Sequence, residues 1–330
     1  MNAEKSDRPM KINSDPVTSP PPSTSASMRF WRLRAAVGEK CGRLSRKKPP
    51  AIKGDHVTFL IPHHNSAEFI DACLHAVRRH HPDSRIIVAD CASLRDQYVG
   101  ARQACERRKA ELRTGWLRHG HTGQLEYLLS LADTEVAVFL DQDCVLLRPL
   151  TPLFDHLRQG KLLVGPRDFM TLDHPRFVSR FPQLRGQIIR FGRNFIHASL
   201  MVTSPAGIRA VAGRRPFYWR TEWDAEYTDG GARGEKYYGL CRQLRMKKPG
   251  SMLPLEHRHT SYGKGMVYLH DGAAVAYHNW YSSAVRYWDG QLDLVDVSWL
   301  RDEARRFLDD YWNEELNFEL PDLFPKGAAD

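Results

Sequence analysis

Two acidic residues at a spacing of two, Asp141 and Asp143, are the best candidates in this sequence for metal and phosphate chemistry. Side chains two apart on an extended chain point the same way, so the pair would present two carboxylates together. Hard divalent cations take oxygen ligands of this kind and keep open positions for phosphate oxygens. Such an ion would neutralise a departing diphosphate.

The context of this acidic pair strengthens the interpretation, because a DxD by itself often marks only a turn. The apolar run VAVFL at 136–140 directly precedes it and reads as a buried strand. Two similar runs come earlier, VTFLIP at 57–62 and RIIVAD at 85–90. The last of these ends in Asp90, a second carboxylate at a strand end.

Helices are predicted between these strands. Asn65 would cap the first, with Glu68 three residues later completing a capping-box-like pair. A polar helical stretch follows to Arg113, and Thr122 heads the next helix. Parallel strands joined by helices collect ligands beyond their carboxyl ends, so Asp90 and the acidic pair would lie where a ligand binds.

Three segments carry a family resemblance: VTFLIPHHNSAEFIDACLHAV, then IIVADCAS, then VAVFLDQDCVLLRPLTPLF. In this order they resemble the opening half of nucleotide-diphospho-sugar transferases of the GT-A fold, most like glycosyltransferase family 2. The resemblance covers Val57 to Phe154. It implies an α/β fold of the Rossmann-like GT-A type, a mostly parallel twisted sheet flanked by helices.

The resemblance also implies site residues for the nucleotide-sugar. Pro62, with its neighbours His63 and Asn65, would line the nucleotide pocket, and Asp90 would contact the base or ribose. Histidine at position 63 departs from the family pattern, in which small or aromatic residues are usual there.

For the metal, the resemblance implies that Asp143 is a direct ligand of Mn²⁺ or Mg²⁺ and that Asp141 lies near the ribose or the metal. Many GT-A enzymes supply a third ligand from a late histidine, and His278 ends the strand-like run AAVAYH. A structural role for this histidine remains open. Three other histidines compete with it: His257, His259 and His270.

The acceptor side would lie in the second half of the chain. Residues 218–226, YWRTEWDAE, interleave three acids with aromatic rings that could stack on sugars. By resemblance to inverting family members, Asp224 would be the catalytic base, with Glu222 and Glu226 behind it. An ordinary helix start with solvated acids remains the alternative.

Three further segments of this half have predicted structures. A strand at 195–203 would lead into a helix headed by Ser204 and Pro205, and residues 298–316 form an amphipathic helix. The stretch 256–266 would be a mobile loop closing over the diphosphate, which Lys264 could reach. A plain surface turn around Lys264 is the other possibility.

The chain divides into residues 1–54, a disordered basic Pro/Ser-rich arm; 55–154, the nucleotide-sugar-binding half; and 155–330, the acceptor-binding half with C-terminal helices. Residues 1–56 contain twelve Lys and Arg against five Asp and Glu, so they carry +7 of the net charge of +9. The nearly balanced body argues against nucleic-acid binding. Within the arm, residues 28–48 could form an interfacial helix or a solvated linker.

Localisation follows from what the sequence lacks. The six cysteines show no CxxC pair or clustered spacing, and no run of about 18 apolar residues occurs. We therefore expect a cytoplasmic protein, whose arm could touch the anionic inner face of the membrane.

The resemblance, together with the acidic motif, implies a glycosyltransferase of the hexosyltransferase class that moves a sugar from a nucleotide-sugar donor to a hydroxyl on a glycan or lipid-linked glycan. A haloacid-dehalogenase-like phosphatase with Asp141 as nucleophile is an alternative, although its DxD would need to lie near the start of its domain. A non-catalytic relative that binds sugar nucleotides is another. The motifs do not distinguish an inverting from a retaining outcome.

Overall fold

The computed structural model of the protein describes residue 52 and residues 56–91, 93–114, 120–167, 196–213, 216–217, 238–262, 265–279 and 298–318. The predicted arm over residues 1–54, apart from Ile52, lies outside them. So does the acidic, aromatic segment at 218–226.

The first unit is the predicted strand, helix, strand. β1 (Val57–His63) and β2 (Arg85–Asp90) run parallel, in a register that sets His63 opposite Asp90, and α2 (Ala67–His80) connects them. Every residue of β1 is buried, as its continuous apolar run requires. Alternate side chains of β1 point to opposite faces of the sheet: Phe59 packs with α2, whereas Leu60 packs on the other face.

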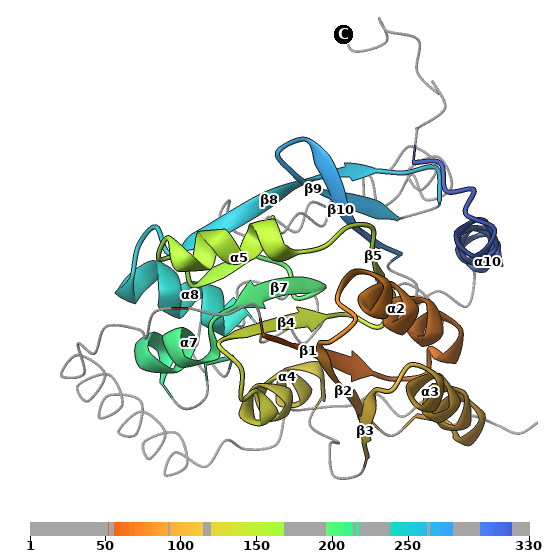
Figure 1. Cartoon of the computed structure of the whole chain (residues 1–330), viewed down its shortest axis with the longest axis horizontal. Coiled ribbons are helices and arrows are strands. Elements are labelled where there is room, and N and C mark those ends of the chain that lie inside the picture. The colour runs from red at the N-terminus through yellow and green to blue at the C-terminus, as the bar shows by residue number, and fades with distance from the viewer. Residues whose placement is uncertain are drawn as a thin grey trace, which may run out of the picture. The chain divides into compact units, whose positions relative to one another are not determined.

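Two more strands extend this parallel sheet. β4 (Val136–Leu140) pairs with the free side of β1, and β3 (Glu111–Arg113) pairs with β2. Helices α2 and α3 (Arg95–Arg107) cover one face, and α4 (Gly120–Leu131) covers the other (Figure 1). The carboxyl ends of β1, β2 and β4 therefore meet at one edge, which the three predicted strand-end acids share.

The later half of the chain continues the sheet with mostly antiparallel pairs. β7 (Leu200–Thr203) pairs with β4, and β6 (Leu163–Pro166) pairs with β7. β8 (Met252–His259) lies parallel to β6 and leads into β9 (Met266–His270), β10 (Ala273–His278) and finally β5 (Cys144–Leu146). Among the described residues this gives a sheet in the order β3-β2-β1-β4-β7-β6-β8-β9-β10-β5. The predicted α/β fold, a twisted sheet flanked by helices with its early strands parallel, is confirmed.

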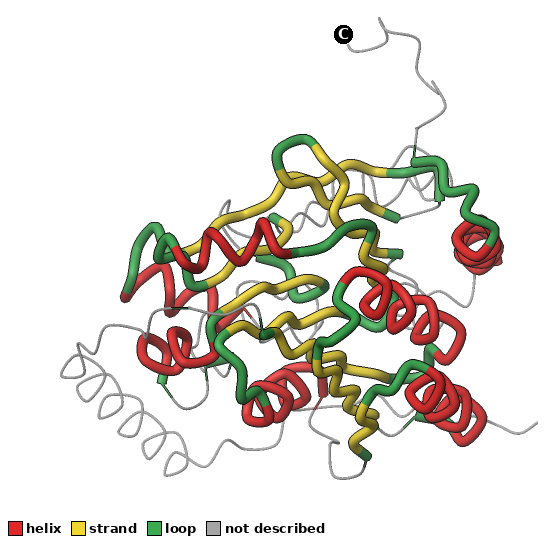
Figure 2. The backbone as a smooth tube through the Cα atoms, in the orientation of Figure 1, coloured by secondary structure: helices red, strands yellow, loops and turns green. Residues whose placement is uncertain are grey.

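Within the described residues, four helices accompany these later strands: α5 (Thr151–Arg158), α7 (Pro205–Ala212), α8 (Tyr238–Lys247) and α10 (Ser298–Trp312). Figure 2 shows them as red segments beside the yellow strands. α7 begins where the sequence predicted, because the hydroxyl of Ser204 accepts a hydrogen bond from the N–H of Gly207 at 3.2 Å. The preceding strand is shorter than predicted and starts at Leu200.

The predicted capping pair at the start of α2 is wrong. The N-cap is Ser66, and Asn65 has a left-handed backbone with φ of 49°. Asn tolerates this conformation, which turns the chain between β1 and α2. The Asn65 side-chain oxygen instead accepts a hydrogen bond from the N–H of Leu94 at 2.7 Å, so it holds the loop after β2.

Three other expectations need correction. The polar stretch that ends at Arg113 is helical only through α3, and its last three residues form β3 because they pair with β2. Thr122 lies inside α4, which starts at Gly120. The predicted loop at 256–266 is half strand, since Glu256 to His259 pair with β9 across a hairpin.

The amphipathic helix predicted near the C-terminus is α10, and it packs against the strand that ends in His278. Phe307 is fully buried, and its ring stacks on Tyr277 of β10 with centroids 4.0 Å apart and planes inclined by 20°. Phe307 also stacks on Phe69 of α2, with ring centroids 6.4 Å apart. This ring therefore links β10 to α2, beside the parallel part of the sheet.

Across the part of the chain that the structure describes, no helix has both the length and the apolar character needed to span a bilayer.

Replacing Phe307 by Ala should lower the free energy of unfolding by about 3 to 5 kcal/mol, because the change leaves a cavity between α2 and β10. Trp312 on the same helix is 44% exposed, so Trp312→Ala is the control and should cost far less. Urea unfolding of both variants measures the difference. Equal losses would show that α10 is not anchored through Phe307.

Candidate active site

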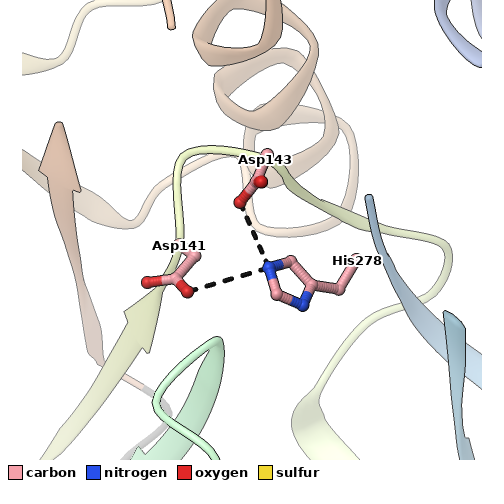
Figure 3. A group of neighbouring side chains, drawn as sticks. All are labelled: Asp141, Asp143 and His278. Carbon is pink, nitrogen blue, oxygen red and sulfur yellow. Dashed lines mark hydrogen bonds and ion pairs between the residues drawn. The ribbon is translucent and has the colours of Figure 1, made fainter. Parts of the chain in front are cut away.

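Three side chains from distant parts of the sequence meet beyond the carboxyl end of β4. Nε2 of His278 lies 3.2 Å from Oδ1 of Asp143 and 3.7 Å from Oδ2 of Asp141. One ligand atom from each residue falls within 4.8 Å of the others. Figure 3 shows the same ring nitrogen directed toward both carboxylates. This geometry can hold a metal ion.

A tight turn brings the two carboxylates together. The N–H of Asp141 donates to the carbonyl of Ser199 at 2.9 Å, which continues the pairing of β4 beyond its last residue. The N–H of Cys144 then donates to the carbonyl of Asp141 at 2.9 Å, so the chain reverses within the motif. The acids therefore converge through a turn, and the extended chain assumed from their spacing is wrong.

His278 reaches this turn through strand pairing. β10 runs antiparallel to β5, in a register that sets His278 opposite Cys144. The N–H of Asn279 then donates to the carbonyl of Asp143 at 3.0 Å. Strand β10 is thus hydrogen-bonded directly to the acidic motif. This pairing explains how His278 and Asp143, 135 positions apart, come into contact.

The site is buried and negatively charged. The side chains of Asp143 and His278 are each 1% exposed, whereas that of Asp141 is 17% exposed. Burial raises the pKa of the nearby Cys73 thiol well above its usual value, and the charges of Asp143 and Asp141 raise it further. Two close carboxylates in a low-dielectric setting repel each other unless a cation lies between them.

The chemistry of these donors suits a hard divalent ion. Carboxylate oxygens are preferred by Mg²⁺ and Mn²⁺, and an imidazole nitrogen is acceptable to Mn²⁺. The predicted cofactor therefore has a set of ligands already assembled in this chain.

The side chain of Gln142, between the two acids, ties the turn to the backbone of His64, directly after β1. Its side-chain oxygen accepts from the N–H of His64 at 2.6 Å, and its side-chain nitrogen donates to the carbonyl of His64 at 3.0 Å. Gln124 of α4 donates to the carbonyls of His63 and Ala89, each at 3.2 Å. Two amides thus hold the ends of β1, β2 and β4 together. Sequence reasoning missed both, although an amide flanked by two aspartates was a visible signal.

The predicted nucleotide residues gather at the ends of β1 and β2. Nδ1 of His63 lies 2.9 Å from Oδ1 of Asp90, and the hydroxyl of Ser93 donates to the same oxygen at 2.5 Å. Burial raises the pKa of Asp90, but the hydrogen bonds from His63 and Ser93 outweigh it, so the net pKa is lowered. Asp90 is therefore ionised near neutral pH and held in one orientation. Pro62 lies in β1 immediately before His63.

Other predicted residues lie elsewhere. His257 and His259 belong to β8, and His270 ends β9, where its Nε2 lies 2.8 Å from Nε2 of His156. None of these three histidines joins the acidic pair among the described residues. The candidate base and its flanking acids lie outside the described residues, as does the candidate diphosphate ligand; they are Asp224, Glu222, Glu226 and Lys264.

Comparison with known proteins is consistent with this site. The sequence model described as Glycosyl transferase family 2 matches residues 58–210. No curated protein sequence matches the chain.

Solved structures similar to this chain are distant. A mannosyltransferase, PcManGT from Pyrobaculum calidifontis in complex with GDP-Man and Mn²⁺, is 16% identical with a TM-score of 0.41, over 86% of this chain and 82% of that one. Glucosyl-3-phosphoglycerate synthase from Mycobacterium tuberculosis, in complex with Mg²⁺ and uridine diphosphate, is 16% identical with a TM-score of 0.38, over 62% and 69%. The galactosyltransferase LgtC, with donor and acceptor sugar analogues, is 15% identical with a TM-score of 0.38, over 62% and 74%.

The family match spans β1, β2 and β4 and includes Asp90, Asp141 and Asp143. It therefore bears out the resemblance of this part of the chain to glycosyltransferase family 2.

Proposed function

We propose that this glycosyltransferase moves a hexose from a nucleotide-sugar donor to a hydroxyl group of a glycan or lipid-linked glycan, with Mn²⁺ or Mg²⁺ at the acidic motif. The observation that carries the proposal is the convergence of Asp141, Asp143 and His278 beyond β4, inside and beside the family-matched segment. A phosphatase that uses Asp141 as nucleophile gains no support from this arrangement.

The three ligands would have different duties. Asp143 and His278 are buried, and backbone pairing of Asn279 with Asp143 and of His278 with Cys144 joins their strands, so they would form the rigid side of the metal site. Asp141 is more exposed and is the carboxylate better able to reach a ribose or a metal-bound donor. The bound ion would supply positive charge to the departing diphosphate.

The nucleotide would lie across the strand ends from β2 to β4. Asp90 would accept hydrogen bonds from the base or ribose, and its orientation is held by His63 and Ser93. Pro62 and Asn65 would line the same pocket. Lys264, in the connection between β8 and β9, would contact the diphosphate.

The acceptor would bind in the half of the chain after residue 155. Asp224 would take the proton of the attacking hydroxyl, with Glu222 and Glu226 beside it. A role in the synthesis of surface polysaccharide fits a cytoplasmic enzyme whose basic arm meets the inner face of the membrane.

A thermal-shift panel tests the donor class. The wild-type protein should melt at a higher temperature with one of UDP, GDP, CMP or dTDP, and only when Mn²⁺ is present. A ligand at 100 times its Kd adds about 2.7 kcal/mol of stability, which corresponds to a shift of several degrees. Mn²⁺ with inorganic phosphate is the control. If no nucleotide gives a metal-dependent shift, the proposed donor site is wrong.

Asp143→Asn should weaken Mn²⁺ binding at least about tenfold, because the buried charge that attracts the ion is lost. Without metal, its melting temperature should not fall, since the repulsion between two nearby carboxylates is relieved. Asp309→Asn, on the exposed face of α10, is the matched control and should behave as wild type. Titration calorimetry gives the affinity, and undiminished binding would remove Asp143 from the ligand set.

Asp224→Asn should abolish sugar transfer while the metal-dependent nucleotide shift survives, because a base acts on the acceptor and not on the donor. A radiolabelled donor sugar measures turnover once the thermal panel has identified its nucleotide. Turnover at the wild-type rate would exclude Asp224 from the mechanism.

A further inference from the structure

Behind His278 two buried hydroxyl groups form a chain of hydrogen bonds. Nδ1 of His278, the ring nitrogen opposite the acids, lies 2.9 Å from the hydroxyl of Tyr268 on β9. That hydroxyl lies 2.7 Å from Oγ of Ser199. His278 and Tyr268 are each 1% exposed and Ser199 is fully buried, so bulk water does not take the place of either contact.

In a neutral imidazole ring only one of the two nitrogens carries a hydrogen, so the state of Nδ1 determines the state of Nε2. For Nε2 to bind a cation it must carry a lone pair, and the neutral ring then has its hydrogen on Nδ1. A buried Nδ1–H needs an acceptor, which the Tyr268 oxygen provides. The tyrosine can accept this bond while it donates its own hydrogen to Ser199 Oγ.

The hydroxyl of Tyr268 can serve both neighbours at once, because a phenol group has one O–H to donate and lone pairs to accept with. It lies 2.9 Å from Nδ1 of His278 and 2.7 Å from Oγ of Ser199.

Ser199 connects this chain to the other side of the site. Its carbonyl accepts the N–H of Asp141 at 2.9 Å, while its side chain contacts Tyr268. Its own N–H donates to Nδ1 of His197 at 3.1 Å, which restrains the backbone at this point. One residue therefore positions the backbone of Asp141 and, through Tyr268, the ring of His278.

We propose that Tyr268, backed by Ser199, is a positioning residue of the metal site that holds His278 in the tautomer and orientation in which Nε2 faces Asp141 and Asp143. This inference rests on the metal site of the proposed function and adds two residues to it. Hydrogen-bond partners of metal-binding histidines typically change metal affinity 10- to 100-fold when they are removed.

Tyr268→Phe removes the hydroxyl and keeps the ring, so it tests the proposal directly. Its Kd for Mn²⁺ alone, measured from the electron paramagnetic resonance signal of free Mn²⁺, should rise about tenfold or more. The nitrogen modulation of bound Mn²⁺, which reports coordination by His278, should weaken. Melting without metal gives the effect on folding separately.

Tyr262→Phe is the matched control. Tyr262 is also 1% exposed, and its hydroxyl bonds to Asp310 at 2.7 Å, away from the acidic pair. Its loss should lower the metal-free melting temperature about as much as Tyr268→Phe, yet change the Kd for Mn²⁺ less than about twofold. An equal loss of affinity in both variants would mean that Tyr268 acts only through general stability.

Ser199→Ala is a milder second variant, which keeps the test decisive if Tyr268→Phe does not fold. It removes only the acceptor for Tyr268, so the Kd for Mn²⁺ should rise about threefold or more, corresponding to a weakened single hydrogen bond. If Tyr268→Phe and Ser199→Ala bind Mn²⁺ with the wild-type Kd and the wild-type nitrogen modulation, the inference is wrong, although the metal site itself would still be supported. Failure of the wild type itself to bind Mn²⁺ would overturn both this inference and the metal site of the proposed function.

Discussion

The antiparallel pairing of β10 with β5 is the contact on which the candidate active site depends. β5 begins at Cys144, directly after the acidic motif, so whatever pairs with it must lie beside Asp141 and Asp143. The pairing sets His278 opposite Cys144, and the N–H of Asn279 closes onto the carbonyl of Asp143. The site is thereby completed by backbone hydrogen bonds, and the side chains of Asp141, Asp143 and His278 lie close enough to share a cation.

Two carboxylates held close together in a buried site repel each other, which destabilises the folded protein. Hydrogen bonds from neighbouring residues hold the turn that carries them in place. Gln142 binds both backbone groups of His64, and Ser199 binds the N–H of Asp141, so the turn cannot swing apart. Phe307 stacks on Tyr277, next to His278, and on Phe69 of α2, so β10 is held against this helix. A rigid, electronegative site of this kind binds a divalent ion with little reorganisation.

The residues at the ends of β1 and β2 are also held by contacts between neighbouring strands. Asp90 and His63 lie opposite each other on neighbouring parallel strands, so their side chains leave the same face of the sheet and meet. The resulting pair, with Ser93, keeps Asp90 ionised and oriented. The histidine that departs from the usual family pattern is thus explained by its contact with Asp90.

The sequence by itself determined the parallel half of this protein, because long apolar runs such as those ending in Asp90 and Asp141 can only be satisfied by burial on both faces of a sheet. It also identified the acidic pair and the late strand that ends in His278. The local sequence pattern was less informative where a turn or a strand pairing determines the structure. Asn65 holds a loop and does not cap α2. Residues 256–259 form a strand because β9 lies beside them. Only the tertiary structure decided that His278 and not His270 meets the acids, and that Tyr268 and Ser199 lie behind it. The physical reason is that such contacts depend on the register between strands up to 135 residues apart, and that register is set by the packing of the whole sheet.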